Sequence, residues 1–185
     1  MRKTKRTQKN IVLGVTASIA AYKACEITRK LKEHGYEVTV VMTPDAQEFI
    51  RPLLFQSLSG RRVYRGLFTE PCEWEIGHIS LAQSANLLLI APATADIIAK
   101  MAGGICDDLL TCVALATKAP VLVCPAMNEN MYTNPLTQAN IKKLASLGYK
   151  FVGPRIGRLA CGKEGIGCLE DVDTIIKEAK RVLDK

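Results

Sequence analysis

The sequence has little of what metal and disulfide sites require. Its seven cysteines include no Cys-x-x-Cys pair, and its histidines are limited to His34 and His78. This composition argues against a zinc site. The number of cysteines is odd, and several lie in apolar segments, where reduced cysteines of a protein core are found. We therefore expect no bound metal.

Long apolar runs are also absent. No run approaches the length of a membrane span, and the basic start is not followed by the apolar segment of a secretory signal. We expect a cytoplasmic protein that does not contact membranes. With 185 residues, 48% of them hydrophobic, the chain fits one globular domain.

Acidic residues are outnumbered, with 18 Asp and Glu against 25 Lys and Arg. Much of the net charge of +7 comes from the run RKTKRTQK at residues 2–9. Segments that bind nucleic acid usually have aromatic residues among their basic ones, and this run has none. We interpret residues 1–9 as a disordered basic tail with no nucleic-acid partner and residues 10–185 as the folded domain.

Five short apolar segments predict buried β-strands, at residues 10–15, 36–42, 86–91, 120–124 and 149–152. Segments of helix length separate them. Ser18 can cap a helix that runs to Gly35, and Thr43 precedes Pro44 at the first position of another. Strands without polar alternation indicate a parallel sheet covered on both faces. We expect a single-domain α/β fold, Rossmann-like and of the flavodoxin type.

Parallel sheets of this kind bind ligands beyond the carboxyl ends of their strands. The first strand leads into the turn VTAS, whose small residues let backbone N–H groups face an anion. This turn is neither a G-x-G-x-x-G nor a Walker sequence, and a simple tight turn explains it equally well. After the third predicted strand, Thr94 and Asp96 either contact a ligand or cap the next helix.

Four further residues are candidates for a site. His78 is either an ordinary residue at a helix start or, because a strand follows it, a group near the ligand crevice. Asn128 and Met131 lie three residues apart, where capping and packing also explain them. The glycines around Cys161, in RLACGKEGIG, predict a mobile lid that carries one thiol. The segment 61–77, with the only tryptophan, is a flap or an interface element.

Five segments in this order resemble the flavin-dependent cysteine decarboxylases: GVTASIAAYK, GHISLA, APATADIIAKMAGGICDDLLT, PAMNENMY and LACGKEGIG. The resemblance runs from residue 10 to about residue 170 and is strongest to the decarboxylases of coenzyme A synthesis. It implies FMN-dependent conversion of 4'-phosphopantothenoylcysteine to 4'-phosphopantetheine. It also implies a homo-oligomer with its flavin site built between subunits, a trimer or a dodecamer built from trimers, and a synthetase as a partner.

The resemblance assigns roles to individual residues. Asn128 becomes the ligand of the substrate carboxylate, and Met131 belongs to the substrate pocket. His78 becomes a base or a thiol-positioning group, and Cys161 contacts the substrate as an acid. The contacts of FMN are Ala17, Ser18, Ile19, Thr43, Thr94, Ala95 and Ala126.

The sequence departs from the family pattern at two places. Asp96 and Ile97 stand where the fullest form of the motif has Asn-Thr, which puts those two flavin contacts in question. Tyr132 stands where many relatives have tryptophan.

The implied reaction oxidises the substrate with FMN to a thioaldehyde, releases carbon dioxide and reduces the resulting enethiolate. Cys161 would donate the final proton, because a thiol with an ordinary pKa of about 8.5 stays protonated at neutral pH. Two alternatives remain: a peptidyl-cysteine decarboxylase and a non-catalytic flavin-binding regulatory subunit. Retention of His78, Asn128 and Cys161 together argues against the second. Flavin prenyltransferases share the fold class but lack the cysteine loop.

Overall fold

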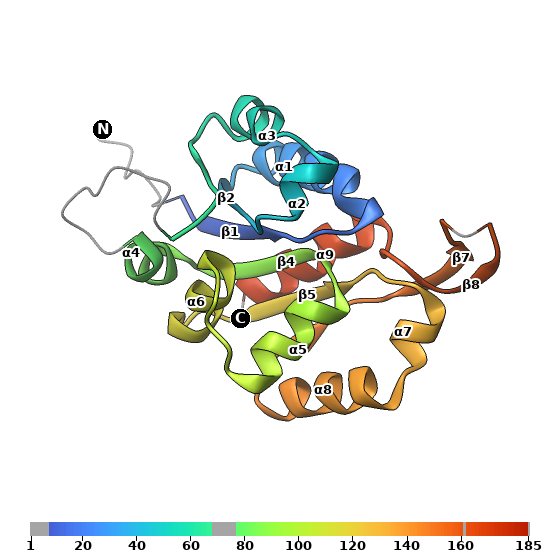
Figure 1. Cartoon of the computed structure of the whole chain (residues 1–185). Helices are drawn as coiled ribbons and strands as arrows, with labels where there is room; N and C mark the ends of the chain where they lie inside the picture. The colour runs from blue at the N-terminus through green and yellow to red at the C-terminus, as the bar shows by residue number, and fades with distance from the viewer. Residues whose placement is uncertain (1–7, 68–76, 161, 185) are drawn as a thin grey trace, which may run out of the picture.

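A computed structural model describes residues 8–67, 77–160 and 162–184. Six parallel strands form one sheet in the order β3-β2-β1-β4-β5-β6 (Figure 1). All five predicted strands are present, and the short edge strand β3 is additional. The strands are β1 (Asn10–Val15), β2 (Glu37–Met42), β3 (Val63–Tyr64), β4 (Leu87–Ala93), β5 (Val121–Pro125) and β6 (Lys150–Phe151).

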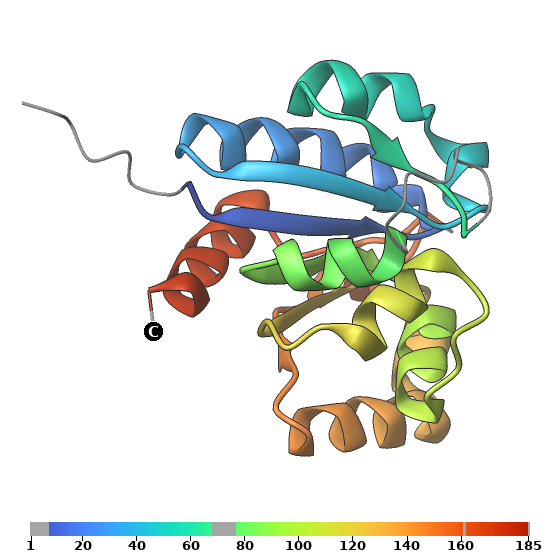
Figure 2. The same cartoon turned by 90° about the vertical axis from the view of Figure 1, so that its left-hand side faces the viewer.

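Helices cover both faces of the sheet (Figures 1 and 2). One face packs against α1 (Lys23–Glu33), α3 (Pro52–Ser59) and α9 (Val172–Leu183). The other packs against α4 (Gly77–Ser84), α5 (Ala95–Gly103), α6 (Leu109–Ala116) and α8 (Pro135–Ser146). The predicted parallel sheet with helices on both faces is therefore confirmed. The short elements are η1 (Ile19–Tyr22), α2 (Ala46–Phe49) and α7 (Glu129–Thr133).

Strand β4 shows why the predicted strands read as unbroken apolar runs. All seven of its residues are buried. Because successive side chains of a strand point to opposite faces, Leu87, Leu89 and Ala91 join one core cluster, while Leu88 and Ile90 join the other. Both faces of the strand are in the core, so no polar alternation remains in its sequence.

Strands β1 and β4 are the neighbours at which the strand order reverses. From β1 the chain continues to β2 on one side, whereas β5 lies on the far side of β4. Open α/β sheets bind ligands at this point, beyond the carboxyl ends of the strands. Thr16 ties the two strand ends together, since its buried Oγ1 donates to Pro92 O (2.8 Å) and accepts from Thr94 N (3.1 Å).

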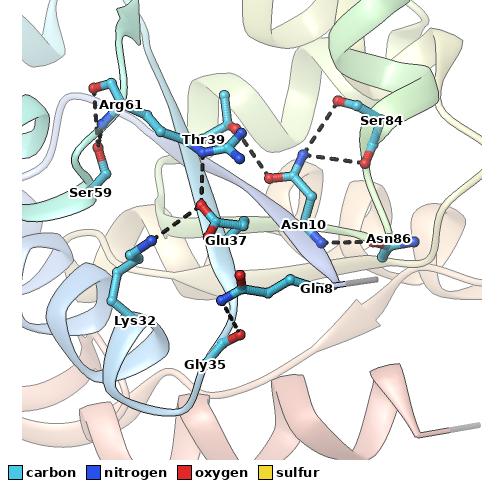
Figure 3. Close-up of polar contacts among 10 residues, drawn as sticks. All are labelled: Gln8, Asn10, Lys32, Gly35, Glu37, Thr39, Ser59, Arg61, Ser84 and Asn86. Atoms are coloured by element: carbon cyan, nitrogen blue, oxygen red, sulfur yellow. Dashed lines mark hydrogen bonds and ion pairs between the residues drawn. The ribbon is translucent and has the colours of Figure 1, made fainter. Parts of the chain in front are cut away.

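Polar side chains close the opposite, amino edge of the same strands (Figure 3). The Asn10 side chain donates through Nδ2 to Ser84 O (3.2 Å) and accepts through Oδ1 from Thr39 Oγ1 (3.1 Å). Its backbone N donates to Asn86 Oδ1 (2.7 Å). One asparagine thus joins β1, β2 and the segment that leads from α4 into β4.

An antiparallel hairpin, β7 (Arg155–Arg158) and β8 (Glu164–Cys168), was not predicted. It contains most of the glycine-rich segment that the sequence indicates as a mobile lid. That interpretation is wrong for Gly165 and Gly167, which are buried in β8. A Cβ on Gly167 would lie 2.1 Å from Met127 O, and one on Gly165 would lie 2.6 Å from the Glu129 carboxylate. These glycines permit close packing, and Cys161 lies outside the described residues.

Two smaller expectations also change. Pro44 does not begin a helix, because α2 starts at Ala46 after a turn. At the expected tail, Gln8 Nε2 donates to Gly35 O (2.6 Å) and Lys9 pairs with Asp184 (3.6 Å), so these two residues contact the domain.

Residues 1–7, and most of the proposed flap at 61–77, lie outside the described residues. None of the described helices has the length and apolar character needed to cross a membrane.

Candidate functional site

Two adjoining cavities lie at the carboxyl edge of the sheet. Their volumes are about 380 Å³ and about 420 Å³, within the range of about 300–1,000 Å³ that is typical of small-molecule sites. Ala17, Thr94 and Met131 line both of them. Both cavities thus lie at the edge that the strand-order rule indicates for a ligand.

The turn after β1 forms one wall of the first cavity. Ser18 has an extended backbone, and its Oγ accepts a hydrogen bond from Ala20 N (3.3 Å) at the start of η1. Its backbone N donates to Thr16 O (2.9 Å). Ala17, Ser18 and Ile19 all line the cavity. The expected serine cap is confirmed, although it caps a short 3-10 turn that precedes α1.

The turn after β4 forms the shared wall. Thr94 is the N-cap of α5, and its Oγ1 accepts from Ile97 N (3.3 Å). Capping and cavity lining thus coexist at Thr94. Asp96 does not cap the helix. It pairs instead with Lys100 (3.4 Å), which also pairs with Asp107 (3.0 Å) in the second cavity. The hydrogen bond from Lys100 to Asp107, reinforced by both negative charges, raises the pKa of Lys100.

Asn128 begins α7 with its amide in a defined orientation. Its Oδ1 accepts from Asn130 N (2.9 Å), which is the usual role of an asparagine N-cap. With the carbonyl oxygen used in this way, Nδ2 carries the two remaining donors. No described residue accepts a hydrogen bond from Nδ2. The side chain lines the first cavity, so the site offers an anion a neutral donor pair.

The hairpin β7–β8 covers the first cavity beside α7. Gly167 O accepts from Met127 N (3.0 Å), which anchors β8 to the residue before Asn128. Sequence reasoning missed the hairpin residues Arg155 and Arg158, which line this cavity, as does Lys23 at the start of α1. The two arginines spaced by three in RIGR were the available signal.

The structure brings together most of the residues singled out in the sequence. Thr43 lines only the second cavity, and Met131 lines both with its side chain about half exposed. The first cavity is lined by six of the seven expected flavin contacts, Ala17, Ser18, Ile19, Thr94, Ala95 and Ala126, together with Asn128.

His78 is not part of this constellation within one chain. It is the second residue of α4, a helix that packs against α6, and it lines neither cavity. Figure 1 shows α4 and α7 on opposite sides of the molecule. Cys161 lies outside the described residues, and its neighbour Ala160 lines the first cavity. Over the described ranges, no three His, Cys, Asp or Glu side chains are grouped as metal ligands.

Comparisons with known proteins agree with this geometry. The bifunctional coenzyme A biosynthesis protein CoaBC of Vibrio vulnificus is 54% identical over 159 residues, which is 86% of this chain and 40% of that protein. A Streptococcus mutans protein named "Probable phosphopantothenoylcysteine decarboxylase" is 46% identical over 177 residues, 95% of this chain and 99% of that one. The chain thus spans about two fifths of the bifunctional relative and nearly all of the single-function relative.

Solved structures match over almost the whole chain. A cysteine-to-serine mutant of PPC decarboxylase, complexed with pantothenoylaminoethenethiol, superposes with a TM-score of 0.86 at 29% identity, covering 96% of this chain and 100% of that one. The FMN-dependent cysteine decarboxylase SpaF superposes with a TM-score of 0.79, also at 29% identity, covering 93% and 98%. The Flavoprotein family model matches residues 1–184. The chain therefore belongs to the Flavoprotein family and is similar over nearly its full length to phosphopantothenoylcysteine decarboxylases.

Proposed function

We propose that the chain catalyses the FMN-dependent decarboxylation of 4'-phosphopantothenoylcysteine to 4'-phosphopantetheine, a step of coenzyme A synthesis. One observation carries the proposal: six of the seven expected flavin contacts and Asn128 line a single cavity at the point where the strand order reverses. The names of the relatives that match this chain support the same activity. The cytoplasm is the proposed location.

The residues of the first cavity fit a flavin. The side chains of Ala17, Ala95 and Ala126 are small, so the cavity walls lie close to the backbone. No aspartate or glutamate is found among the described residues that line the first cavity, which suits an anionic cofactor. Bound FMN would supply a reversible hydride acceptor. Such an acceptor is needed because the substrate carboxylate has no neighbouring electron sink to stabilise the charge left when it departs as carbon dioxide.

Asn128 would hold the substrate carboxylate. Oδ1 is committed to the start of α7, which leaves the Nδ2 donors for a ligand in the cavity that Asn128 lines. A neutral amide binds a carboxylate without a full positive charge, and a full charge would oppose loss of the carboxylate as neutral carbon dioxide. The same N-cap bond fixes the side chain, so little conformational freedom is lost on binding.

His78 would act across a subunit boundary. The resemblance implies a flavin site built between subunits of a homo-oligomer, and within one chain His78 lies away from both cavities. We therefore assign His78 to the cavity of a neighbouring copy, where its imidazole would take or hold the proton of the substrate thiol. A synthetase that forms the substrate, fused or separate, is the proposed partner in the preceding step.

The proposal is tested with the purified chain reconstituted with FMN. Incubation with 4'-phosphopantothenoylcysteine should release carbon dioxide and give 4'-phosphopantetheine by mass spectrometry. A peptide that ends in cysteine is the competing substrate, and faster turnover of that peptide would favour the peptidyl-cysteine alternative. A chain that acquires no flavin absorbance, or that binds flavin but turns over neither substrate, would contradict the proposal.

A second experiment tests the proton donor. Because a serine hydroxyl is far too weak an acid to replace a thiol, Cys161→Ser should release carbon dioxide but yield a species two hydrogens lighter than phosphopantetheine, with the flavin left reduced. Cys106→Ser changes an exposed thiol and is the control that should give the saturated product. Normal phosphopantetheine from Cys161→Ser would remove the thiol from the mechanism.

A further inference from the structure

Three cationic side chains line the first cavity and have no place in the proposed chemistry. Lys23 comes from the first residue of α1, and Arg155 and Arg158 come from the two ends of β7. They lie on the wall formed by the hairpin and α1. No carboxylate is found among the described residues that line this cavity, so its lining carries an excess of three positive charges.

Two of these cations have no partner among the residues that the structure describes. Neither the Lys23 ammonium nor the Arg158 guanidinium makes an ion pair or hydrogen bond with any residue that the structure describes. Both side chains are at least partly exposed, so hydration offsets the cost of the missing partners in the protein without a ligand. All the N–H groups of these two side chains are therefore available to bind an anion in the cavity.

Arg155 pairs with a carboxylate that lies outside the cavity lining. Its Nε lies 3.2 Å from Asp171 Oδ1, close enough for an ion pair, although the angle is not that of a hydrogen bond. The guanidinium also packs over Gly157, where a Cβ would lie 3.4 Å from its Nη1. Asp171 does not line the cavity. Arg155 is therefore positioned by protein contacts at its Nε side, which leaves its terminal amino groups available.

We propose that Lys23, Arg155 and Arg158 form a subsite for the phosphomonoester of the substrate. The assignment rests on the proposed function and extends it, because it specifies a phosphorylated small molecule and disfavours a peptide. A phosphomonoester near neutral pH carries close to two negative charges, and arginine binds its oxygens in a planar, two-donor geometry.

The position of the subsite selects the phosphate of the substrate over that of FMN. Six of the expected flavin contacts lie in the turns that follow β1, β4 and β5. The two arginines instead lie on the hairpin, which is anchored by the Met127 N to Gly167 O bond beside Asn128. The same hairpin wall thus faces the group that would bind the substrate carboxylate.

The test compares two substrates that differ only in the phosphate, 4'-phosphopantothenoylcysteine and pantothenoylcysteine. Arg158→Gln and Lys23→Gln should each lower kcat/KM for the phosphorylated substrate by about 10- to 100-fold, the usual effect of losing a hydrogen bond to a charged group. Neither should change kcat/KM for pantothenoylcysteine. Lys163→Gln, on the same hairpin but outside the cavity lining, removes one charge as the matched control and should leave both values unchanged.

A parallel titration with FMN and riboflavin identifies the other source of a phosphomonoester. The FMN-to-riboflavin affinity ratio should be the same in wild type and both variants. A selective loss of FMN affinity, with the substrate ratio unchanged, would assign the cations to the cofactor and overturn the proposal. An equal fall for both substrates would also overturn it. If the wild-type protein turns over neither substrate, the proposed function itself fails, and the assignment fails with it.

Discussion

The two edges of the central sheet use the same strands in opposite ways. At the amino edge, the ends of β1, β2 and β4 are joined by polar side chains that bind one another (Figure 3). At the carboxyl edge, the same strands end in small residues and backbone turns around two cavities. One edge has its polar groups satisfied within the protein, and the other leaves donors available.

Glu37 shows how closely the amino edge is closed. Its Oε2 lies 3.2 Å from Lys32 Nζ and 2.8 Å from Arg61 Nε, and Figure 3 shows both cations converging on it. Burial alone would raise the pKa of Glu37, but the hydrogen bonds and charges of Lys32 and Arg61 outweigh it and lower the pKa below 4.5. Both cations bind the same carboxylate oxygen, so the charge of Glu37 is paired within the protein.

Polar residues at the amino edge stabilise the fold, whereas those at the carboxyl edge are available to bind a ligand. Polar groups that bind one another within the protein contribute to the free energy of unfolding, whereas donors that face a cavity do so only when a ligand is present. Changes at the carboxyl edge should therefore reduce turnover with little effect on the ligand-free fold. Changes at the amino edge should do the reverse.

The largest effect is expected for Asn128→Asp. The new carboxylate would repel the substrate carboxylate, so kcat/KM should fall by at least about 100-fold. FMN should remain bound, and the melting temperature of the flavin-free protein should stay the same, because aspartate is as good an N-cap as asparagine. Steady-state carbon dioxide release and a thermal melt provide the two readouts.

Asn134→Asp is the matched control, since Asn134 caps α8 in the same way, with its Oδ1 2.9 Å from Leu136 N. It does not line either cavity. Full activity is expected from this variant. Unchanged activity in Asn128→Asp would remove Asn128 from the site.

His78→Asn tests whether the site is completed by a second subunit. The variant should lose the oxidative half-reaction, so substrate should no longer bleach the flavin. Mixed oligomers of His78→Asn and Asn128→Asp chains should regain part of the activity, because some cavities would combine a native histidine with a native asparagine. Mixtures as inactive as their parents, or a monomeric holo-protein in light scattering, would contradict a site shared between subunits.

Gly167→Ala should destabilise the hairpin by about 3 kcal/mol, because its Cβ would meet Met127 O at 2.1 Å. Gly162→Ala is the control. Gly162 also has a positive φ of +85°, but a Cβ there meets nothing within 4 Å, so about 1 kcal/mol is expected from the backbone conformation alone. Chemical denaturation of the two variants measures the difference, and equal losses would show that the contact with Met127 is unimportant.

The smallest effect is expected at the amino edge, from Glu37→Gln. A lowered pKa in the folded state means that the ionised carboxylate stabilises the fold above its unfolded pKa, near 4.5, and that this contribution is lost as the pH falls further. At pH 7 the variant should be less stable by about 0.5–1 kcal/mol, with turnover unchanged. Melting curves from pH 7 to pH 3 should converge below pH 4.5, and a constant gap would contradict the ion pairs.

The sequence predicted the sheet because its strands are buried on both faces. Segments such as Leu87–Ala93 are unbroken apolar runs, whereas β3 has two residues and β7 carries two arginines, so neither has the pattern of a buried strand. The turn glycines were misinterpreted for a related reason. Gly167 is required by a backbone contact with Met127, and sequence patterns do not report contacts between distant segments.

The sequence predicted candidate site residues that follow the end of a strand. Thr94 and Asn128 follow strands β4 and β5, so the edge rule places them together. Thr16 directly follows β1, but its role as a tie to Pro92 and Thr94 depends on strand order, which the sequence does not give. The location of His78 away from both cavities also depends on the packing of α4 on α6.

A crystal structure of the chain loaded with FMN would test the central claim most directly, that the open carboxyl edge is the flavin site. The account predicts flavin density in the two adjoining cavities, in contact with Thr94 and Ala126, with the Asn128 amide facing the same space and the amino-edge network around Asn10 and Glu37 unchanged. Flavin density outside both cavities, or flavin contacts that leave Thr94 and Ala126 exposed, would contradict it.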